Sequence, residues 1–195
     1  MYSRKDSYYL KAKKEGYKSR AAYKLLELNQ KYKFIRKDYK ALDLGAAPGG
    51  WSQVALELVG TGGSVTAVDM EEIVGINASN FTFIHGNMLD SVIADKLETN
   101  ASGGYDIIIS DMAPKTSGIR IKDHADSIKL AQTAATMADK MLKKGGAFLV
   151  KLFDGEDRPA FVDELRKKYK NIHQTRPDAT RKNSFEMYIV ALSRL

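Results

Sequence analysis

The chain has 195 residues, of which 44% are hydrophobic and 28% are charged, a composition typical of one folded domain spanning residues 1–195. It contains no cysteine, which excludes disulfides and thiolate metal sites. No apolar run reaches the roughly 18 residues that a membrane span needs. The polar first nine residues lack the apolar core of a signal peptide, so we expect a cytoplasmic protein.

The positive charge is concentrated at the N-terminus. Residues 1–40 hold 13 basic and 4 acidic residues out of 31 and 24 in the whole chain, which leaves 18 basic against 20 acidic residues elsewhere. Such a segment either binds a polyanion or is a solubilising tail. Interspersed tyrosines favour nucleic acid, because cations neutralise phosphates while aromatic faces stack on bases. The candidate contacts are Lys5, Lys11, Lys13, Lys14, Lys18 and Arg20.

Helical and strand patterns alternate through the rest of the chain. Ser19–Tyr32 is predicted to be a helix with one apolar side and Ser19 as its N-cap. The segments that follow are, in order, Ala41–Leu44 (strand), Trp51–Val59 (helix), Ser64–Val68 (strand), Phe81–Ile84 (strand), Ser91–Glu98 (helix), Tyr105–Ser110 (strand), Lys122–Leu142 (helix, stopped by Gly145-Gly146), Ala147–Leu152 (strand), Arg158–Tyr169 (helix), Ile172–Thr175 (strand) and Met187–Leu192 (strand).

This alternation implies parallel strands joined by right-handed crossovers. No helix separates the last two strands, so we expect them to form an antiparallel hairpin at or within one edge of the sheet. The predicted fold class is therefore α/β, with a mostly parallel seven-stranded sheet, one antiparallel strand, and helices on both faces.

A glycine-rich loop follows the first strand directly. It fails the dinucleotide fingerprint, because the third position counted from Gly45 is Ala47, and no Gly-Lys-Ser/Thr follows as in a P-loop. Small residues let a ligand approach the backbone closely, and a proline stiffens the turn. The loop therefore predicts a ligand without a pyrophosphate. Its candidate residues are Asp43, Gly45, Ala46, Pro48, Gly49, Gly50 and Trp51.

The next two strand ends carry further polar groups. Asp69 can accept hydrogen bonds from both hydroxyls of an adenosine ribose. Asn87 can bond an adenine edge through its amide, and Met88 follows it. These residues could instead be strand-end caps, and the glycines could serve only a turn. Together they predict a nucleoside ligand across three strand ends, and S-adenosylmethionine fits because its cationic groups would lie near Asp43.

Five sequence blocks resemble the FtsJ/RrmJ family of ribose 2′-O-methyltransferases, in order and over nearly the whole chain. They are Ser19–Leu25, Asp43–Trp51, Ser110–Pro114, Val150–Phe153 and Ser184–Tyr188. The resemblance implies a Rossmann-like S-adenosylmethionine-dependent methyltransferase fold. It also implies a Lys-Asp-Lys-Glu catalytic tetrad, which corresponds here to Lys24, Asp111, Lys151 and Glu186. This sequence departs from the family at Asn87, where aspartate is common.

The chemistry makes sense of that tetrad. A ribose hydroxyl is a poor nucleophile, so the enzyme must align it with the methyl donor and help its proton leave. Lys151 would lie beside the 2′-oxygen, as a base when neutral or as a charge stabiliser when protonated. Asp111 would orient Lys151 and face the sulfonium, and Lys24 and Glu186 would complete the array. Each of the four residues also has a purely structural interpretation. That interpretation is hardest to apply to Lys151, because a lysine at the end of an apolar strand fits poorly in a packed core.

The resemblance implies a monomeric enzyme without a metal that methylates a ribose, with a uridine as the expected acceptor, in ribosomal RNA of the large subunit. The basic segment at about residues 1–40 would bind that RNA. Transfer RNA is the nearest alternative substrate. A non-catalytic RNA-binding assembly factor on the same fold is a second class, and a nucleotide-dependent oxidoreductase, disfavoured by the glycine pattern, is a third.

Overall fold

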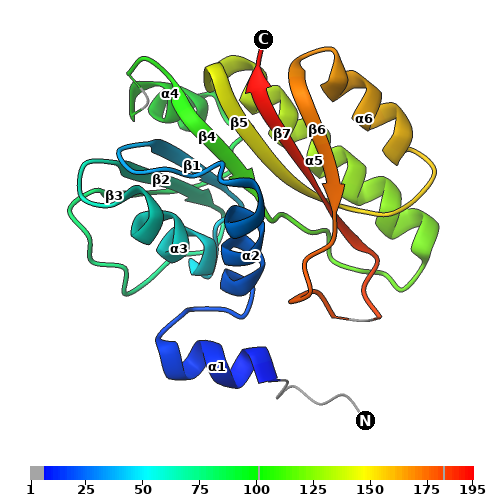
Figure 1. Ribbon diagram of the computed structural model, residues 1–195, viewed down its shortest axis with the longest axis horizontal. Coiled ribbons are helices and arrows are strands. Elements are labelled where there is room, and N and C mark those ends of the chain that lie inside the picture. Colours follow the sequence, from blue (N-terminus) through cyan, green and yellow to red (C-terminus); the bar gives the residue numbers. More distant parts are fainter. Residues whose placement is uncertain (1–6, 101, 182) are drawn as a thin grey trace.

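A computed structural model describes residues 7–100, 102–181 and 183–195. The candidate RNA contact Lys5 lies outside these residues. All strands join one seven-stranded sheet in the order β3-β2-β1-β4-β5-β7-β6 (Figure 1). The strands are β1 (Lys40–Leu44), β2 (Ser64–Asp69), β3 (Phe81–His85), β4 (Tyr105–Ser110), β5 (Leu142–Phe153), β6 (Tyr169–Thr175) and β7 (Glu186–Arg194).

The sheet topology confirms the predicted fold class. Strands β1 to β5 pair in parallel, and only β7 runs antiparallel, inserted between β5 and the edge strand β6. The strand order reverses between β1 and β4, and ligands of open α/β sheets bind beyond the carboxyl ends of the strands at such a point.

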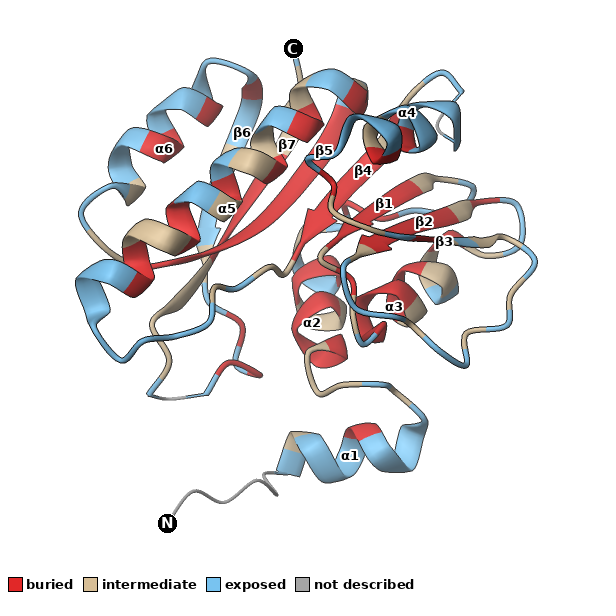
Figure 2. Cartoon of the chain, turned by 180° about the vertical axis from the view of Figure 1, so that it is seen from behind, coloured by how far each residue is buried: buried red, intermediate tan, exposed pale blue. Residues whose placement is uncertain are grey.

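Helices cover both faces of the sheet. Two hydrophobic clusters, one on each face, enclose the strands, so the strands read as nearly continuous apolar runs (Figure 2). One face is covered by α2 (Ala22–Tyr32) and α3 (Gly50–Val59), and the other by α4 (Ser91–Asn100), α5 (Arg120–Met141) and α6 (Arg158–Arg166). Within the described part of the chain, no helix is long and apolar enough to cross a membrane.

The first predicted helix is wrong at its start. It begins at Ala22 rather than Ser19, and no side chain caps it. The carbonyl of Ser19 accepts the Ala22 amide in a preceding turn at 3.3 Å. The hydroxyl of Ser19 instead lies against Gly50, where a Cβ atom would come within 2.4 Å of it. The tertiary contact between this turn and α3 has replaced the local cap.

Two helix ends also differ from the prediction. Helix α5 ends at Met141, and the chain enters β5 directly at Leu142, because Leu142 pairs with Tyr105. Gly145, with φ +77°, lies in an irregularity of β5 rather than stopping the helix. Helix α6 ends at Arg166, and Tyr169 belongs to β6, where its buried ring stacks on Phe148.

One helix was not predicted. Residues Ser7–Glu15 form α1, which projects from the body of the molecule in Figure 1 and buries only Ala12. Ala12 packs with Tyr23 of α2 and Ala179 of the β6–β7 loop. The apolar periodicity of α1 is too weak to identify it, since its stability depends on this docking rather than on a broad apolar face.

Candidate functional site

A cavity of about 450 Å³ lies beyond the carboxyl ends of β1 to β4. Five of the predicted cofactor residues line it, and they are Gly45, Asp69, Asn87, Met88 and Asp111. Sequence reasoning missed the other lining residues, which are Ala47, Met70, Glu71, Gly86, Leu89, Met112, Ala113, Leu130 and Thr133. Leu130 and Thr133 come from α5, so only the tertiary packing brings them here.

The loop after β1 is shaped by its glycine and by Asp69. Gly45 has φ +72°, and a Cβ atom there would come within 2.2 Å of the Met112 side chain. Only glycine therefore fits at this point beside the cavity. One carboxylate oxygen of Asp69 accepts the amide of Ala47 at 2.9 Å, and the other accepts the amide of Glu71 at 2.8 Å. Asp69 thus holds two lining loops in place at the cavity.

Asp43 is fully buried beneath this loop. One of its carboxylate oxygens accepts the Ser52 hydroxyl at 2.7 Å, whereas the other, Oδ1, has no hydrogen-bond partner. Burial raises the pKa of Asp43 to about 7, and the charges of Asp111 and Asp69 add to the effect. The mutual repulsion of these carboxylate charges favours a cationic ligand, because positive charge nearby would stabilise their ionised forms.

The remaining predicted cofactor residues support the loop rather than line the cavity. They are Asp43, Ala46, Pro48, Gly49, Gly50 and Trp51. Trp51 is buried, its indole nitrogen donates to the carbonyl of Ala21 at 2.8 Å, and its ring lies beside Tyr188. Trp51 therefore joins α3 to α2 and β7. Its contact with a cofactor stays a prediction.

Asn87 lines the cavity after β3. Its amide oxygen accepts the backbone amide of Leu89 at 3.0 Å, which orients the side chain. An aspartate could accept the same hydrogen bond, but only an asparagine also presents an amide donor. At Asn87, where the family commonly has aspartate, the site therefore offers a ligand the amide group as a hydrogen-bond donor.

The four predicted catalytic residues form two ion pairs. The Lys151 ammonium lies 2.9 Å from the Asp111 carboxylate and also donates to the Asp111 carbonyl. The Lys24 ammonium lies 2.6 Å from the Glu186 carboxylate. Lys24 and Lys151 are only 8% and 6% exposed, which is unusual for lysine and indicates that their positions are fixed by their partners.

Tyr188 links the two pairs, and sequence reasoning did not single it out. Its hydroxyl donates to the Asp111 carboxylate at 2.8 Å, and the Lys24 ammonium lies 5.7 Å from its ring centre. Tyr188 is paired with Lys151 in the β5–β7 ladder, so both side chains point to the same face of the sheet. The alternation Glu186-Met187-Tyr188 was the available signal, because residues two apart on a strand share a face.

The electrostatics set the charge states of Asp111 and Tyr188. Burial would raise the pKa of Asp111, but the charge of Lys151, followed by that of Lys24, outweighs it and holds the pKa below the ordinary value. Asp111 is therefore ionised at neutral pH. Burial, followed by the charge of Asp111, raises the pKa of Tyr188 well above its ordinary value, so Tyr188 stays a neutral donor.

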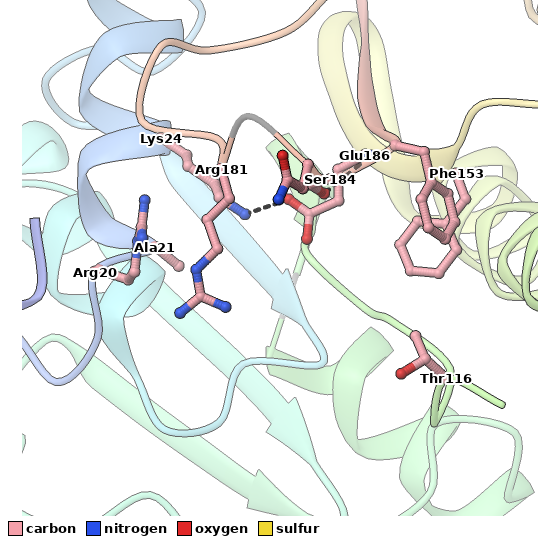
Figure 3. Close-up of a pocket in the computed structure, with 10 residues that line it drawn as sticks. Arg20, Ala21, Lys24, Thr116, Phe153, Arg181, Ser184 and Glu186 are labelled. Carbon is pink, nitrogen blue, oxygen red and sulfur yellow. Dashed lines mark hydrogen bonds and ion pairs between the residues drawn. The ribbon is translucent and has the colours of Figure 1, made fainter. Parts of the chain in front are cut away.

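A second cavity, of about 820 Å³, adjoins the other end of the array (Figure 3). Lys24 and Glu186 line it, whereas Asp111 lines the first cavity. The contacts from Asp111 through Lys151 and Tyr188 to Lys24 therefore connect the two cavities. The other lining residues are Arg20, Ala21, Thr116, Phe153, Arg181, Asn183, Ser184 and Phe185.

The described basic candidates divide into three groups. Lys13 and Lys14 are exposed on α1. Lys11 makes a 3.9 Å ion pair with Glu15 and lies over the Tyr23 ring, and Lys18 lies against Gly75. Only Arg20 reaches the second cavity. Across the described ranges, no three histidine or carboxylate side chains gather as a metal site would require.

The fold and the site define a Rossmann-like methyltransferase, and comparisons with known proteins agree. A family model for FtsJ-like methyltransferases matches residues 17–194. A protein of Methanothermobacter thermautotrophicus named ribosomal RNA large subunit methyltransferase E is 48% identical over 187 residues, which cover 96% of this chain and 89% of the relative. A protein of the same name from Coxiella burnetii is 45% identical over 195 residues, with 96% and 90% covered.

Solved structures show the same relationship. A ribosomal RNA methyltransferase from Plasmodium falciparum superposes with a TM-score of 0.81 at 30% identity, over 92% of this chain and 99% of that one. The chain therefore belongs to the FtsJ-like methyltransferase family. The resemblance seen in its sequence blocks and the predicted enzyme class are both confirmed.

Proposed function

We propose that this protein transfers a methyl group from S-adenosylmethionine to a ribose 2′-hydroxyl in ribosomal RNA of the large subunit. The observation that carries the proposal is the paired Lys151–Asp111 and Lys24–Glu186 array between two cavities. One cavity suits a methyl donor and the other an acceptor. The names of the 41–48% identical relatives support ribosomal RNA as the substrate.

The first cavity fits S-adenosylmethionine by its own residues. Asp69 offers carboxylate oxygens for ribose hydroxyls, Asn87 offers an amide for the adenine edge, and Gly45 permits close approach of the ligand to the backbone. The carboxylates Asp43 and Asp111 provide negative potential for a cationic ligand. When bound, this cofactor supplies an electrophilic methyl group, so the protein need only position and activate the acceptor.

The array then acts on the acceptor oxygen. We assign to Lys151 the role of holding the 2′-oxygen while that oxygen forms its bond to the methyl group and its proton passes to solvent water. The ammonium counters the negative charge that develops on the oxygen. Asp111, ionised and bonded to Lys151 and Tyr188, fixes the direction of that ammonium. Lys24 and Glu186 form the wall of the second cavity and align the ribose.

Ribosomal RNA from a strain lacking this protein tests the proposal directly. We expect mass spectrometry to show the loss of one 2′-O-methyl nucleotide from large-subunit RNA, with a uridine as the expected base. Reintroducing the wild-type protein should restore it. Loss of a 2′-O-methyl group from transfer RNA instead would favour the alternative substrate, and an unchanged set of 2′-O-methyl nucleotides would overturn the proposal.

Replacing Lys151 by Ala separates catalysis from an assembly role. We expect methyl transfer to fall by at least about a thousandfold, because no other side chain occupies its place beside Asp111. Binding of S-adenosylmethionine and of RNA should persist, measured by calorimetry and filter binding. A control, Lys143→Ala, removes another half-buried lysine paired with an aspartate, Asp106, away from both cavities. Unaltered transfer by K151A would remove the catalytic assignment.

A further inference from the structure

Much of the second cavity is unused by the proposed chemistry. The tetrad accounts for Lys24 and Glu186, but the cavity is large enough for an entire ligand of drug-like size. Its remaining walls include two phenylalanines, Phe153 and Phe185, and two arginines, Arg20 and Arg181. Figure 3 shows Arg20 and Arg181 on one side of the Lys24–Glu186 pair and Phe153 on the other.

The aromatic wall lies where β5 and β7, which carry Lys151 and Glu186, meet. Phe153 is paired with Glu186 in the β5–β7 ladder and follows Lys151 by two residues, so it shares their face of the sheet. The rings of Phe153 and Phe185 meet edge to face, with centres 4.6 Å apart. Phe185 is half-buried, and the Arg120 guanidinium lies 5.8 Å from its ring centre.

Phe185 also lines a smaller cavity, of about 310 Å³, together with Arg120 and Arg176. A flat apolar ring with cationic groups on both sides is the arrangement that proteins use to bind single-stranded nucleic acid, where bases stack and phosphates meet arginine. A chain of nucleotides passing over Phe185 would meet positive charge before and after it.

The basic wall brings two like charges together. The Arg20 guanidinium is held by the carbonyl of Ala179 at 2.5 Å. Burial, followed by the nearby charge of Arg181, lowers the pKa of Arg20. Arg20 and Arg181 both line this cavity, and two guanidinium groups bordering one space suit a phosphate, which can accept hydrogen bonds from both.

We propose that the second cavity holds the acceptor nucleotide swung out of its RNA helix, with its base on Phe185 and its phosphate between Arg20 and Arg181. The inference rests on the proposed function and names the form in which that site takes its substrate. A base within a duplex is covered on both faces by its neighbours, so it cannot lie against Phe185 until it leaves the stack. The RNA segment recognised is therefore a loop, or a helix that opens at the acceptor.

The test measures coupling between Phe185 and the acceptor base. The probes are two RNA oligonucleotides spanning the nucleotide whose methylation is lost in the deletion strain, one intact and one abasic at that position. We expect the wild-type protein to bind the abasic RNA about tenfold more weakly than the intact RNA, since one stacked base is lost. For Phe185→Leu, which keeps an apolar side chain, the two RNAs should bind equally.

Controls keep this outcome interpretable. Calorimetric binding of S-adenosylmethionine should be the same for F185L and the wild type, which shows that the variant is folded. Phe83→Leu makes the same change on β3, outside both cavities, and should retain the tenfold preference for intact RNA. Phe185→Tyr should recover most of the affinity for intact RNA that F185L loses.

The phosphate site is tested in the same binding assay. Arg181→Glu should weaken binding of intact RNA at least tenfold and make that binding less dependent on salt. Arg166→Glu reverses a charge on the exposed face of α6, away from the cavity, and should have little effect. The inference is overturned if F185L keeps the wild-type preference for intact RNA, or if R181E binds like R166E. Failure of the proposed function would show itself separately, because the ribosomal RNA of the deletion strain would then carry an unchanged set of 2′-O-methyl nucleotides.

Discussion

Single residues beside the carboxyl ends of the parallel strands form the candidate site. Lys24 and Glu186, 162 positions apart in the sequence, approach to 2.6 Å. Their roles were suggested by a family resemblance, because an isolated lysine on a helix is usually solvated. The geometry of the pair is visible only when both partners are in place. Tyr188 shows the same limitation, since its role depends on Asp111, far away in the sequence.

Replacing Gly45 tests whether this single residue shapes the first cavity. Gly45→Ala should abolish most cofactor affinity, by at least about tenfold, because the new methyl group would collide with Met112 beside the cavity. It should also lower the free energy of unfolding by about 1 kcal/mol or more, since φ is +72°. Calorimetric titration with S-adenosylmethionine and urea unfolding measure the two effects.

Gly60 provides the matched control. It has φ +66°, but a Cβ atom there would meet nothing within 4 Å. Gly60→Ala should therefore share the backbone cost without the loss of cofactor affinity. If both variants bind the cofactor like the wild type, Gly45 has no role in shaping the cavity.

At the scale of elements, α1, α2 and the β6–β7 loop form one unit beside the second cavity. Glu27 of α2 accepts the amides of Asp178 and Ala179 at 2.7 and 3.2 Å. Ala12 of α1 packs against the same loop. The basic helix is thereby attached to the loop that carries Arg181, a residue of the second cavity.

Charge reversal on α1 tests whether this surface binds RNA. Lys13→Glu with Lys14→Glu should weaken RNA binding about tenfold at low salt and make it less salt-dependent, because fewer counterions are released. Lys11 is left intact, since it contacts Tyr23 and Glu15 and its loss would disturb the docking of α1. Fluorescence anisotropy with a labelled ribosomal RNA fragment measures both effects.

The control reverses the same number of charges elsewhere. Lys167 follows the end of α6 and Lys170 is the second residue of β6; both are exposed and line neither cavity. Lys167→Glu with Lys170→Glu should leave RNA affinity nearly unchanged. If the α1 variant behaves like this control, the basic segment is a solubilising tail.

In the whole molecule, one antiparallel strand completes a parallel sheet. Strand β7 runs opposite to β5 and places its first residues, Glu186 and Tyr188, beside the last residues of β5. The carboxyl ends of β1 to β4 hold the first cavity, and the junction of β5 with β7 borders the second. The array therefore lies where the parallel and antiparallel parts of the sheet meet.

Ligand binding to the whole domain distinguishes the proposed cofactor from a dinucleotide. At a concentration of one hundred times its dissociation constant, S-adenosylmethionine should stabilise the protein by about 2.7 kcal/mol. For a chain of this length that corresponds to a rise in Tm of roughly 5–10 °C. NAD should give no comparable rise, because the loop after β1 lacks the dinucleotide fingerprint. An equal rise with NAD would contradict the cofactor assignment.

The sequence by itself determined the fold class and most of the element order, because apolar runs and helical periodicity are local. It also marked Gly45, Asp69, Asn87 and Asp111, since residues at strand ends share one edge of a parallel sheet. Through its resemblance to a family, it indicated the tetrad. It could not fix the start of α2 or the end of α5, where tertiary contacts replace local caps.

Only the tertiary structure decided how these residues meet. It paired Lys24 with Glu186 and Lys151 with Asp111, and it placed Tyr188 between the pairs. It also brought Arg181 from the β6–β7 loop to the cavity that Arg20 lines. The physical reason is that hydrogen bonds and ion pairs act over a few ångströms, whereas the residues that form them are up to 162 positions apart in the chain.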